Sequence, residues 1–368
     1  MRKVLTILFS FMMAFTLFGC GDKNNDNGET TDNNDVEQVA VFWYTFADDY
    51  LSTVRATLNN EFKAAGISYK DYDCNGNQTD QTNKIFTVLA TGVKVLVVNQ
   101  VESNAVDTTK TILDAAKDAG AKVVFFNRPI SVDDTEAEAL LNDYGSAFIG
   151  TDYEQAGHFE GKMVGEYLLA HYDELDLNKD GKISYVMLKG QETNTEAIAR
   201  TLYSVEDANV MLKEAGKPEL AYYDEKASNK YLVDVNGTWS SEAAYNHMES
   251  VLSEYNEENG NMPELIIANN DGMALGAIRS LKEHGYNNGK DATTIPVFGV
   301  DAIQAAKDAI DAGEMAGTVK QDSDGMAKVI YITATNLLAG EAPTAHISDE
   351  FEIVGTWRVN IPYSTYIK

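Results

Sequence analysis

Polar side chains follow several apolar, strand-like runs of this sequence, at the points where those runs end. They are carboxylates and amides: Asp48 and Asp49 after the first run, Asn127 in FFNRP, Asn269, Asn270 and Asp271 in ANND, and Asp301 in FGVDA. Groups of this kind form charge-assisted hydrogen bonds to hydroxyls, each contributing about 1.5–3 kcal/mol when buried. Any one of them could instead be the N-cap of the following helix. As a set, they predict a cleft for a neutral, polyhydroxylated ligand whose apolar faces stack on aromatic rings.

A second group of oxygen-bearing residues has the spacing of a calcium loop. The pattern D-x-N-x-D-G-x-I-x of an EF-hand-type loop covers 176–184, with ligands expected from Asp176, Asn178, Asp180, the Lys182 carbonyl and Ser184. Position twelve, which supplies a bidentate Glu in an EF-hand, is Met187. A carboxylate from elsewhere in the chain therefore has to complete the set. The alternative is a turn of this composition that binds no metal.

Other chemistries find little support in the sequence. No HExxH, CxxC, GxSxG, GxGxxG or GxxxxGK[ST] motif is present. Lys and Arg total 29 against 57 Asp and Glu, a formal charge of −28, which repels phosphate backbones and argues against a nucleic acid partner. Cys74 could be a nucleophile, but the simpler interpretation is a small buried residue.

The first residues have the pattern of an export signal. Arg2 and Lys3 precede an apolar run that is too short to span a membrane. The run ends at Leu17, Phe18, Gly19 and Cys20, which resemble the lipobox of bacterial lipoproteins. We expect a signal peptide at 1–19 and a lipidated Cys20. The polar segment 20–38 then forms a disordered tether that anchors the exported protein to the outer face of the cytoplasmic membrane.

Strands and helices alternate over the rest of the chain. Apolar runs at 39–46, 93–100 and 122–129 are separated by helical stretches at 48–65, 80–91 and 104–119, and a second series follows between 153 and 302. Continuous apolar runs in this arrangement predict parallel strands that are covered on both faces. The fold class is therefore α/β, with two Rossmann-like lobes. Ligands of such sheets bind beyond the carboxyl ends of the strands, where the polar residues above lie.

From about Val39 to Lys368 the chain resembles the periplasmic glucose/galactose-binding protein family, which has the type I periplasmic binding protein fold. The similarity runs through FFN, LDLNKDGKI, LKG, IANNDGMALGA, IPVFGVDA and AGTV. It implies two sugar-binding lobes joined by a three-segment hinge. We expect the N-terminal lobe at 39–150 plus 321–354 and the C-terminal lobe, with the calcium loop, at 151–320 plus 355–368.

The resemblance also implies roles for individual residues. Hydroxyl-binding positions of the family match Asp48, Asn127, Arg200, Asn270 and Asp301, and the two aromatic residues that clamp the sugar ring match Tyr50 and Trp239. Four sugar-contacting positions depart from the family: Asn194 and Glu196 replace a His and an Asp, Gln321 replaces an Asn, and Tyr50 replaces a Phe. The carboxylate that completes a structural calcium site matches Glu264.

The expected function is that of a monomeric substrate-binding lipoprotein of an ABC importer. It captures a glucose- or galactose-type monosaccharide by hinge closure and delivers it to the permease subunits, with a chemoreceptor as a further partner. A pentose-binding protein of the same fold is one alternative. A glycosidase that uses Asp48 and Asp301 as acid and base is another. For a binding protein we expect an Arg to hold the sugar-binding carboxylates ionised.

Overall fold

The computed structural model describes residues 37–289 and 292–367. The predicted signal peptide, Cys20 and the predicted tether up to residue 36 lie outside the described residues. The last two residues assigned to that tether belong to the fold. The backbone N–H of Gln38 donates to the carbonyl of Ser68 at 2.9 Å, and the hydroxyl of Tyr72 donates to the Glu37 carboxylate at 2.8 Å.

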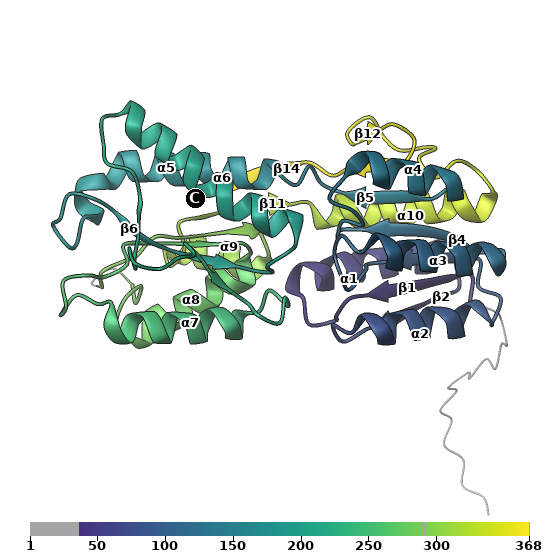
Figure 1. Ribbon diagram of the computed structural model, residues 1–368, viewed down its shortest axis with the longest axis horizontal. Helices are drawn as coiled ribbons and strands as arrows, with labels where there is room; N and C mark the ends of the chain where they lie inside the picture. Colours follow the sequence, from purple (N-terminus) through teal and green to yellow (C-terminus); the bar gives the residue numbers. More distant parts are fainter. Residues whose placement is uncertain (1–36, 290–291, 368) are drawn as a thin grey trace, which may run out of the picture. The chain divides into compact units, whose positions relative to one another are not determined.

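One mostly parallel sheet lies in the first lobe (Figure 1). Its strands are β1 (Val39–Trp43), β2 (Tyr69–Asp73), β3 (Val95–Val98), β4 (Lys122–Phe126), β5 (Ala147–Gly150), β12 (Glu352–Val354) and β13 (Arg358–Asn360). Their order is β12-β13-β5-β4-β3-β1-β2, and the pairs are parallel except β12 with β13. Every residue of β1 and β3 is buried, as expected of strands that have helices on both faces.

The helices of the first lobe are α1 (Asp49–Ala64), α2 (Gln78–Leu89), α3 (Val106–Asp118), α4 (Asp134–Tyr144) and α10 (Ser323–Ala339). Although α10 comes late in the sequence, it contacts α1 and strands β3 to β5, so the chain returns to the first lobe (Figure 1). Within this lobe Cys74 is buried and unpaired, and burial raises the pKa of its thiol to about 12. It is therefore a packing residue, as expected.

The second lobe repeats this architecture. Its strands are β6 (Ser184–Lys189), β7 (Ala221–Tyr222), β8 (Leu232–Val233), β9 (Leu265–Ala268), β10 (Val297–Asp301), β11 (Gly317–Gln321) and β14 (Tyr363–Ile367). Their order is β14-β11-β10-β9-β6-β7, with β8 also paired to β6 and β14 antiparallel to β11. The helices are α5 (Gln155–Leu175), α6 (Thr195–Glu214), α7 (Ser241–Glu254), α8 (Asp271–Glu283) and α9 (Gln304–Ala312).

Side chains of β6 alternate between two hydrophobic clusters. Val186 and Leu188 pack in a cluster with residues of α7, α8 and α9, whereas Tyr185 and Met187 pack with residues of α5 and α6. This period of two places a helical layer on each face of the sheet. The α/β prediction with two largely parallel sheets is thus confirmed. No helix within 37–289 and 292–367 has the length and apolar character needed to cross a membrane.

The described chain passes between the two sheets at three places: between β5 and α5, between β11 and α10, and between β13 and β14. The predicted boundary at 355 is wrong, because Arg358 to Asn360 pair in parallel with β5 of the first lobe. The predicted boundary at 321 is also shifted, since Gln321 is the last residue of β11 and pairs with Tyr363 in the second sheet.

Candidate functional site

A cleft lies where the carboxyl ends of strands from both lobes meet. All ten residues predicted to bind sugar line it, together with two residues that the sequence analysis did not single out. The lining consists of Tyr44, Asp48, Tyr50, Asn127, Arg128, Asn194, Glu196, Arg200, Trp239, Asn270, Asp301 and Gln321. Three other polar residues at strand ends, Asp49, Asn269 and Asp271, are outside this lining.

Three of the lining residues also start helices. The side-chain oxygens of Asp48, Asn194 and Asn270 each accept a hydrogen bond from the backbone N–H three residues further on, at 2.8, 3.1 and 2.9 Å. They are the N-caps of α1, α6 and α8. The N-cap alternative is therefore correct for Asp48 and Asn270, and it does not compete with a place in the cleft. Capping therefore holds these three side chains at the N-terminal ends of helices that begin beside the cleft.

Unusual backbone conformations also occur in the lining. Asn127, Trp239 and Asp301 have positive φ angles of 61°, 58° and 126°. Residues other than glycine rarely adopt these values, and each such residue costs of the order of 1–3 kcal/mol. Strain of this kind persists where the surrounding fold over-determines it, which is frequent at binding sites. The backbone therefore holds an amide, an indole and a carboxylate in fixed places around the cleft.

Arg200 connects the cleft to the hinge segments. Its guanidinium is buried and donates to the Asn269 carbonyl at 2.8 Å, to Glu196 at 3.1 Å, to Gln321 at 3.1 Å and to the Tyr363 hydroxyl at 2.9 Å. Burial alone would lower the pKa of Arg200, but the neighbouring Tyr363 and Glu196 outweigh it and raise that pKa. The cation is thus held in place by residues of α6, β11 and β14.

Asp301 has an acceptor group that the protein leaves free. Within the described residues, no side-chain hydrogen bond involves the Asp301 carboxylate. This is unusual for a buried residue, and only 7% of Asp301 is exposed. Burial raises the pKa of Asp301 well above its ordinary value, and the nearby Asp271, Asp48 and Glu196 raise it further, whereas Arg200 lowers it. The expected arginine, Arg200, therefore favours the ionised form of this carboxylate but is not the largest influence on its pKa. Burial and like charges outweigh Arg200.

Several polar atoms of the lining residues are buried without a partner. They are the Tyr50 hydroxyl, Nε of Arg200 and Nε2 of Gln321. Buried polar atoms in folded proteins are almost always hydrogen-bonded, and each one left unpaired costs about 1–3 kcal/mol. Unpaired groups in a cleft that also contains the free Asp301 carboxylate fit a ligand that supplies both hydrogen-bond donors and acceptors.

Aromatic rings line the cleft from both lobes. Tyr44 and Tyr50 belong to the first lobe and Trp239 to the second. The Trp239 ring lies directly against Gly190, where a Cβ atom would be 2.2 Å from the indole. Glycine at this position therefore makes room for the ring.

Tyr44 and Arg128 are the two lining residues that the sequence analysis missed. The Arg128 guanidinium lies 4.0 Å from the centre of the Tyr44 ring and donates to Gln191 of the second lobe. The sequence could have marked both residues as candidates for the cleft, because Tyr44 directly follows β1 and Arg128 directly follows Asn127. A further hydrogen bond between the lobes runs from the Asn104 amide to the Thr193 carbonyl at 3.0 Å.

The loop at 176–184 has part of the geometry of a calcium loop. The Asp176 carboxylate accepts hydrogen bonds from the backbone N–H groups of Asp180 and Gly181 at 3.1 and 3.0 Å, and Gly181 has a φ of 83°. The expected completing residue lies against this loop: the Glu264 carboxylate accepts from the backbone N–H of Asn178 at 2.9 Å and of Ser184 at 2.8 Å. Within the described residues, no three His, Cys, Asp or Glu side chains are placed to hold a metal. Calcium binding by Asp176, Asn178, Asp180, Lys182, Ser184 and Glu264 stays a prediction.

Two α/β lobes that enclose a polar, aromatic-lined cleft at their strand ends define a bilobal ligand-binding protein. Comparison with known families agrees with this class. Residues 39–342 match the periplasmic binding protein domain, and the chain belongs to that family.

Individual relatives cover most of the chain. The D-galactose/methyl-galactoside binding periplasmic protein MglB of Haemophilus influenzae is 33% identical over 308 residues, which are 83% of each chain. The D-ribose/D-allose-binding protein of Pseudomonas aeruginosa is 26% identical over 73% of this chain and 71% of its own. A solute-binding protein of an ABC transporter from Actinobacillus succinogenes, solved with bound D-allose, superposes with a TM-score of 0.66 at 18% identity and covers 90% of this chain and 97% of its own. That likeness concerns the fold.

Proposed function

We propose that this protein is the sugar-binding component of an ABC importer and that its ligand is an aldohexose of the glucose or galactose type. The observation that carries the proposal is the set of unpaired polar atoms around the cleft. Tyr50, Arg200 and Gln321 contribute buried groups without partners, and Asp301 contributes a free carboxylate. Sugar hydroxyls donate and accept hydrogen bonds, so a hexose satisfies both kinds of group at once.

The comparisons support the same ligand class. The relative that is 33% identical is named for galactose and methyl-galactoside, whereas more distant relatives are named for ribose, allose and other polyols. Clamping between Tyr50 and Trp239 suits the apolar faces of a pyranose ring. The membership in an importer is supported by the structural neighbour that serves an ABC transporter.

Calorimetric titration with D-glucose, D-galactose, D-ribose, L-arabinose and myo-inositol tests the proposal. We expect the tightest binding for one of the two aldohexoses. Preference for a pentose would replace the hexose assignment, and absence of binding to the whole panel would remove it. Arg200→Lys tests the contribution of the guanidinium. This variant keeps the positive charge but loses the planar set of donors that bonds Glu196, Gln321 and Tyr363, so it should weaken sugar binding.

A glycosidase is the second candidate, since the raised pKa of Asp301 is a property that a general acid of glycoside hydrolysis needs. Incubating the protein with nitrophenyl glycosides of glucose and galactose separates the two functions. A binding protein releases no nitrophenol above the rate of the Asp301→Asn variant. Catalytic release that Asp301→Asn abolishes would establish hydrolysis instead.

Further sequence-based predictions concern the attachment of the protein and its loop. Lipidation of Cys20 is supported by the preceding residues 17–19, and mass spectrometry of the membrane fraction tests it. Binding of a structural calcium ion is supported by the pattern of 176–184 and by the hydrogen bonds that hold the Glu264 carboxylate against this loop. Unfolding temperatures measured with calcium and with chelator decide the matter. Monomeric state and a chemoreceptor partner stay predictions.

A further inference from the structure

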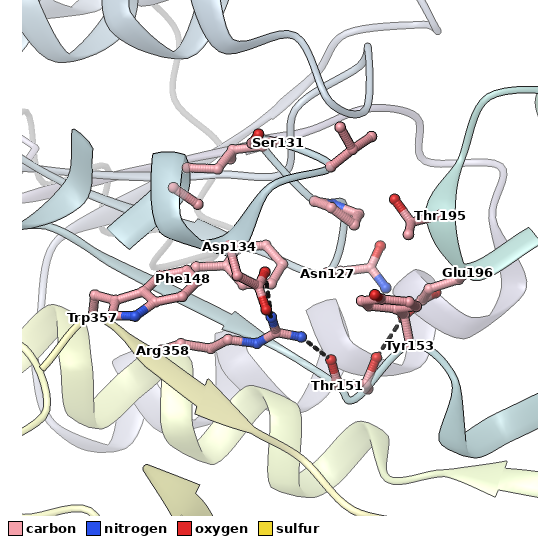
Figure 2. Close-up of a pocket in the computed structure, with 14 residues that line it drawn as sticks. Asn127, Ser131, Asp134, Phe148, Thr151, Tyr153, Thr195, Glu196, Trp357 and Arg358 are labelled. Atoms are coloured by element: carbon pink, nitrogen blue, oxygen red, sulfur yellow. Dashed lines mark hydrogen bonds and ion pairs between the residues drawn. The ribbon is translucent and has the colours of Figure 1, made fainter. Parts of the chain in front are cut away.

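The beginning of α6 is a part of the second lobe that bonds to the first lobe at several points. Glu196, in the first turn of this helix, accepts a hydrogen bond from Thr151 at the end of β5, at 2.5 Å, and Figure 2 shows this bond. Gln191, just before the helix, accepts a hydrogen bond from Arg128, which follows β4. Neighbouring strands of the first sheet thus end against one short stretch of the second lobe.

A further group of contacts involves the loop between β3 and α3, and β3 lies two strands from β5 in the first sheet. The side-chain amide of Asn104 donates to the Thr193 carbonyl at 3.0 Å, and its oxygen accepts from the Thr195 hydroxyl at 3.2 Å. The Asn194 amide donates to the Ser103 hydroxyl at 3.0 Å. These five residues form the closure contact, in which each hydrogen bond joins one lobe to the other.

The backbone of the first lobe holds Asn104 in place for this contact. The N–H of Asn104 donates to the Pro129 carbonyl at 2.7 Å, in the loop after β4. Its φ angle of 62° lies in the left-handed region, which asparagine tolerates better than most residues but which still costs free energy. The first lobe therefore fixes Asn104 in an unfavourable conformation in which both ends of its side-chain amide reach the second lobe.

The closure contact is separate from the sugar site. Of its five residues only Asn194 lines the cleft. Each end of the Asn194 amide is already bonded to protein, because its oxygen accepts from the Ala197 N–H at 3.1 Å and its nitrogen donates to Ser103. Any effect of Ser103, Asn104 or Thr195 on sugar affinity therefore has to act through the arrangement of the lobes.

The hydrogen bonds of the closure contact exist only while the lobes are together. Lobes that are joined by hinge segments separate by rotation about those segments. The first crossing leaves from β5, and the end of β3 is about 10 Å away across the sheet, so rotation moves that end away from α6. The bond between Thr151 and Glu196 lies at the crossing itself, where the movement is smallest. Opening therefore breaks the closure contact first.

We propose that Ser103, Asn104 and Thr195 set the sugar affinity of this protein by stabilising the closed arrangement of the lobes and not by contact with the sugar. The inference rests on the proposed function, because the ligand has to bind between the lobes for closure to change its affinity. The apparent affinity of such a ligand is proportional to the fraction of protein in the binding-competent form. Loss of the closure contact therefore weakens the binding of every sugar by the same factor. Loss of a group that bonds the sugar weakens some sugars more than others.

Asn104→Gly tests the proposal, because glycine keeps the left-handed backbone available and removes both hydrogen bonds of the side chain. Calorimetric titration with D-glucose, D-galactose and D-ribose measures the affinities. One neutral hydrogen bond corresponds to roughly a fivefold change in an equilibrium constant. The dissociation constant should therefore rise roughly 5- to 30-fold, by the same factor for each sugar that binds. Small-angle X-ray scattering of the sugar-free variant should show a larger radius of gyration wherever the unmodified protein is partly closed.

Asn75→Gly is the matched control. Asn75 is an exposed asparagine of the first lobe with a φ angle of 50°, so the same substitution is made in the same kind of backbone conformation, outside the cleft lining and the closure contact. It should leave the affinities and the radius of gyration unchanged.

Thr195→Val removes one hydrogen bond from the opposite lobe and covers the case that Asn104→Gly does not fold. It should weaken binding roughly fivefold. In the double variant Thr195→Val should add nothing to Asn104→Gly, because the bond between the two side chains is already lost.

The outcomes separate the closure contact from the proposed function. A loss of affinity that differs between sugars, or that is additive in the double variant, overturns the proposal while the sugar assignment stands. Unchanged affinities together with an unchanged radius of gyration overturn it as well. If the unmodified protein binds no sugar, the proposed function fails. The radius of gyration of Asn104→Gly then tests the closure contact alone: a larger value supports it, and an equal value excludes it.

Discussion

Replacing Gly190 by Ala should displace the Trp239 ring from the cleft. The added Cβ would lie 2.2 Å from two atoms of the indole, where ordinary carbon contacts are about 3.5 Å, so a shift of about 1.3 Å is needed. The backbone at Gly190 is not free to retreat, because its N–H donates to the Asn269 side chain at 3.1 Å. The conformation of Gly190 is open to Ala, since its φ is not positive. The ring therefore has to give way.

The expected loss of sugar affinity follows from the stacking of the Trp239 ring on the sugar. Stacking on an aromatic face contributes about 0.5–1.5 kcal/mol beyond area burial, and about 40 Å² of lost apolar contact adds roughly 1 kcal/mol. We expect a weakening of about 1.5–2.5 kcal/mol, or roughly 10- to 70-fold in the dissociation constant. Calorimetric titration with the preferred hexose measures it, and near-ultraviolet circular dichroism reports the displaced indole.

Gly272→Ala is the matched control for this variant. Gly272 also borders the site and has no positive φ, but the nearest atoms to its added Cβ lie at 3.5 Å, an ordinary contact. It should bind with unchanged affinity and gain slightly in stability, because Ala favours the helix that starts there. If Gly190→Ala binds sugar as tightly as the unmodified protein, the Trp239 ring does not clamp the ligand and this reasoning is refuted.

Three further variants test the charges and the packing behind the cleft. Asp301→Asn should weaken hexose binding by about 2 kcal/mol in calorimetry, because a free acceptor of charge-assisted bonds is lost, and an unchanged affinity would contradict its role. Burial raises the pKa of Asp271 to about 7, whereas an aspartate in the unfolded chain has a pKa near 4. Asp271 therefore contributes to the free energy of unfolding below about pH 4, and this contribution is lost as the pH rises to about 7. Urea unfolding should therefore show lower stability at pH 8 than at pH 5, with a smaller difference in Asp271→Asn; an equal difference in both proteins would exclude this cause. Gly157→Ala would place a Cβ 2.6 Å from the Ala199 carbonyl and should lower the free energy of unfolding by about 1–3 kcal/mol, whereas an unaltered urea midpoint would show that α5 and α6 separate easily.

The architecture could be predicted because its strands are buried on both faces. Runs such as VAVFW in β1 and LIIA in β9 are apolar at every residue, a pattern that belongs to parallel strands under two helical layers. The rule that ligands bind at the carboxyl ends of such strands then located the cleft. The same rule marked Asp48, Asn127, Asn270 and Asp301, whereas Arg200 and Trp239 came from the resemblance because they follow no strand that the pattern alone would have marked.

Other features could not be read from the sequence, for identifiable reasons. β2 reads YKDYD and has no fully buried residue, so it carries no apolar signal as an edge strand. β13 contains Arg358, which is buried only because Asp134, more than two hundred residues earlier, pairs with it. The raised pKa of Asp301 depends on carboxylates from separate elements that only the folded chain brings together.

The capping residues bear on how ligand preference can diverge in this fold. Substituting an N-cap by Ala costs about 1 kcal/mol, so Asp48 and Asn270 are confined to the few residue types that can still start a helix. Glu196 and Gln321 line the same cavity and cap nothing. New specificities should therefore arise first at positions of this kind, where selection can exchange one side chain for another without the loss of a helix cap.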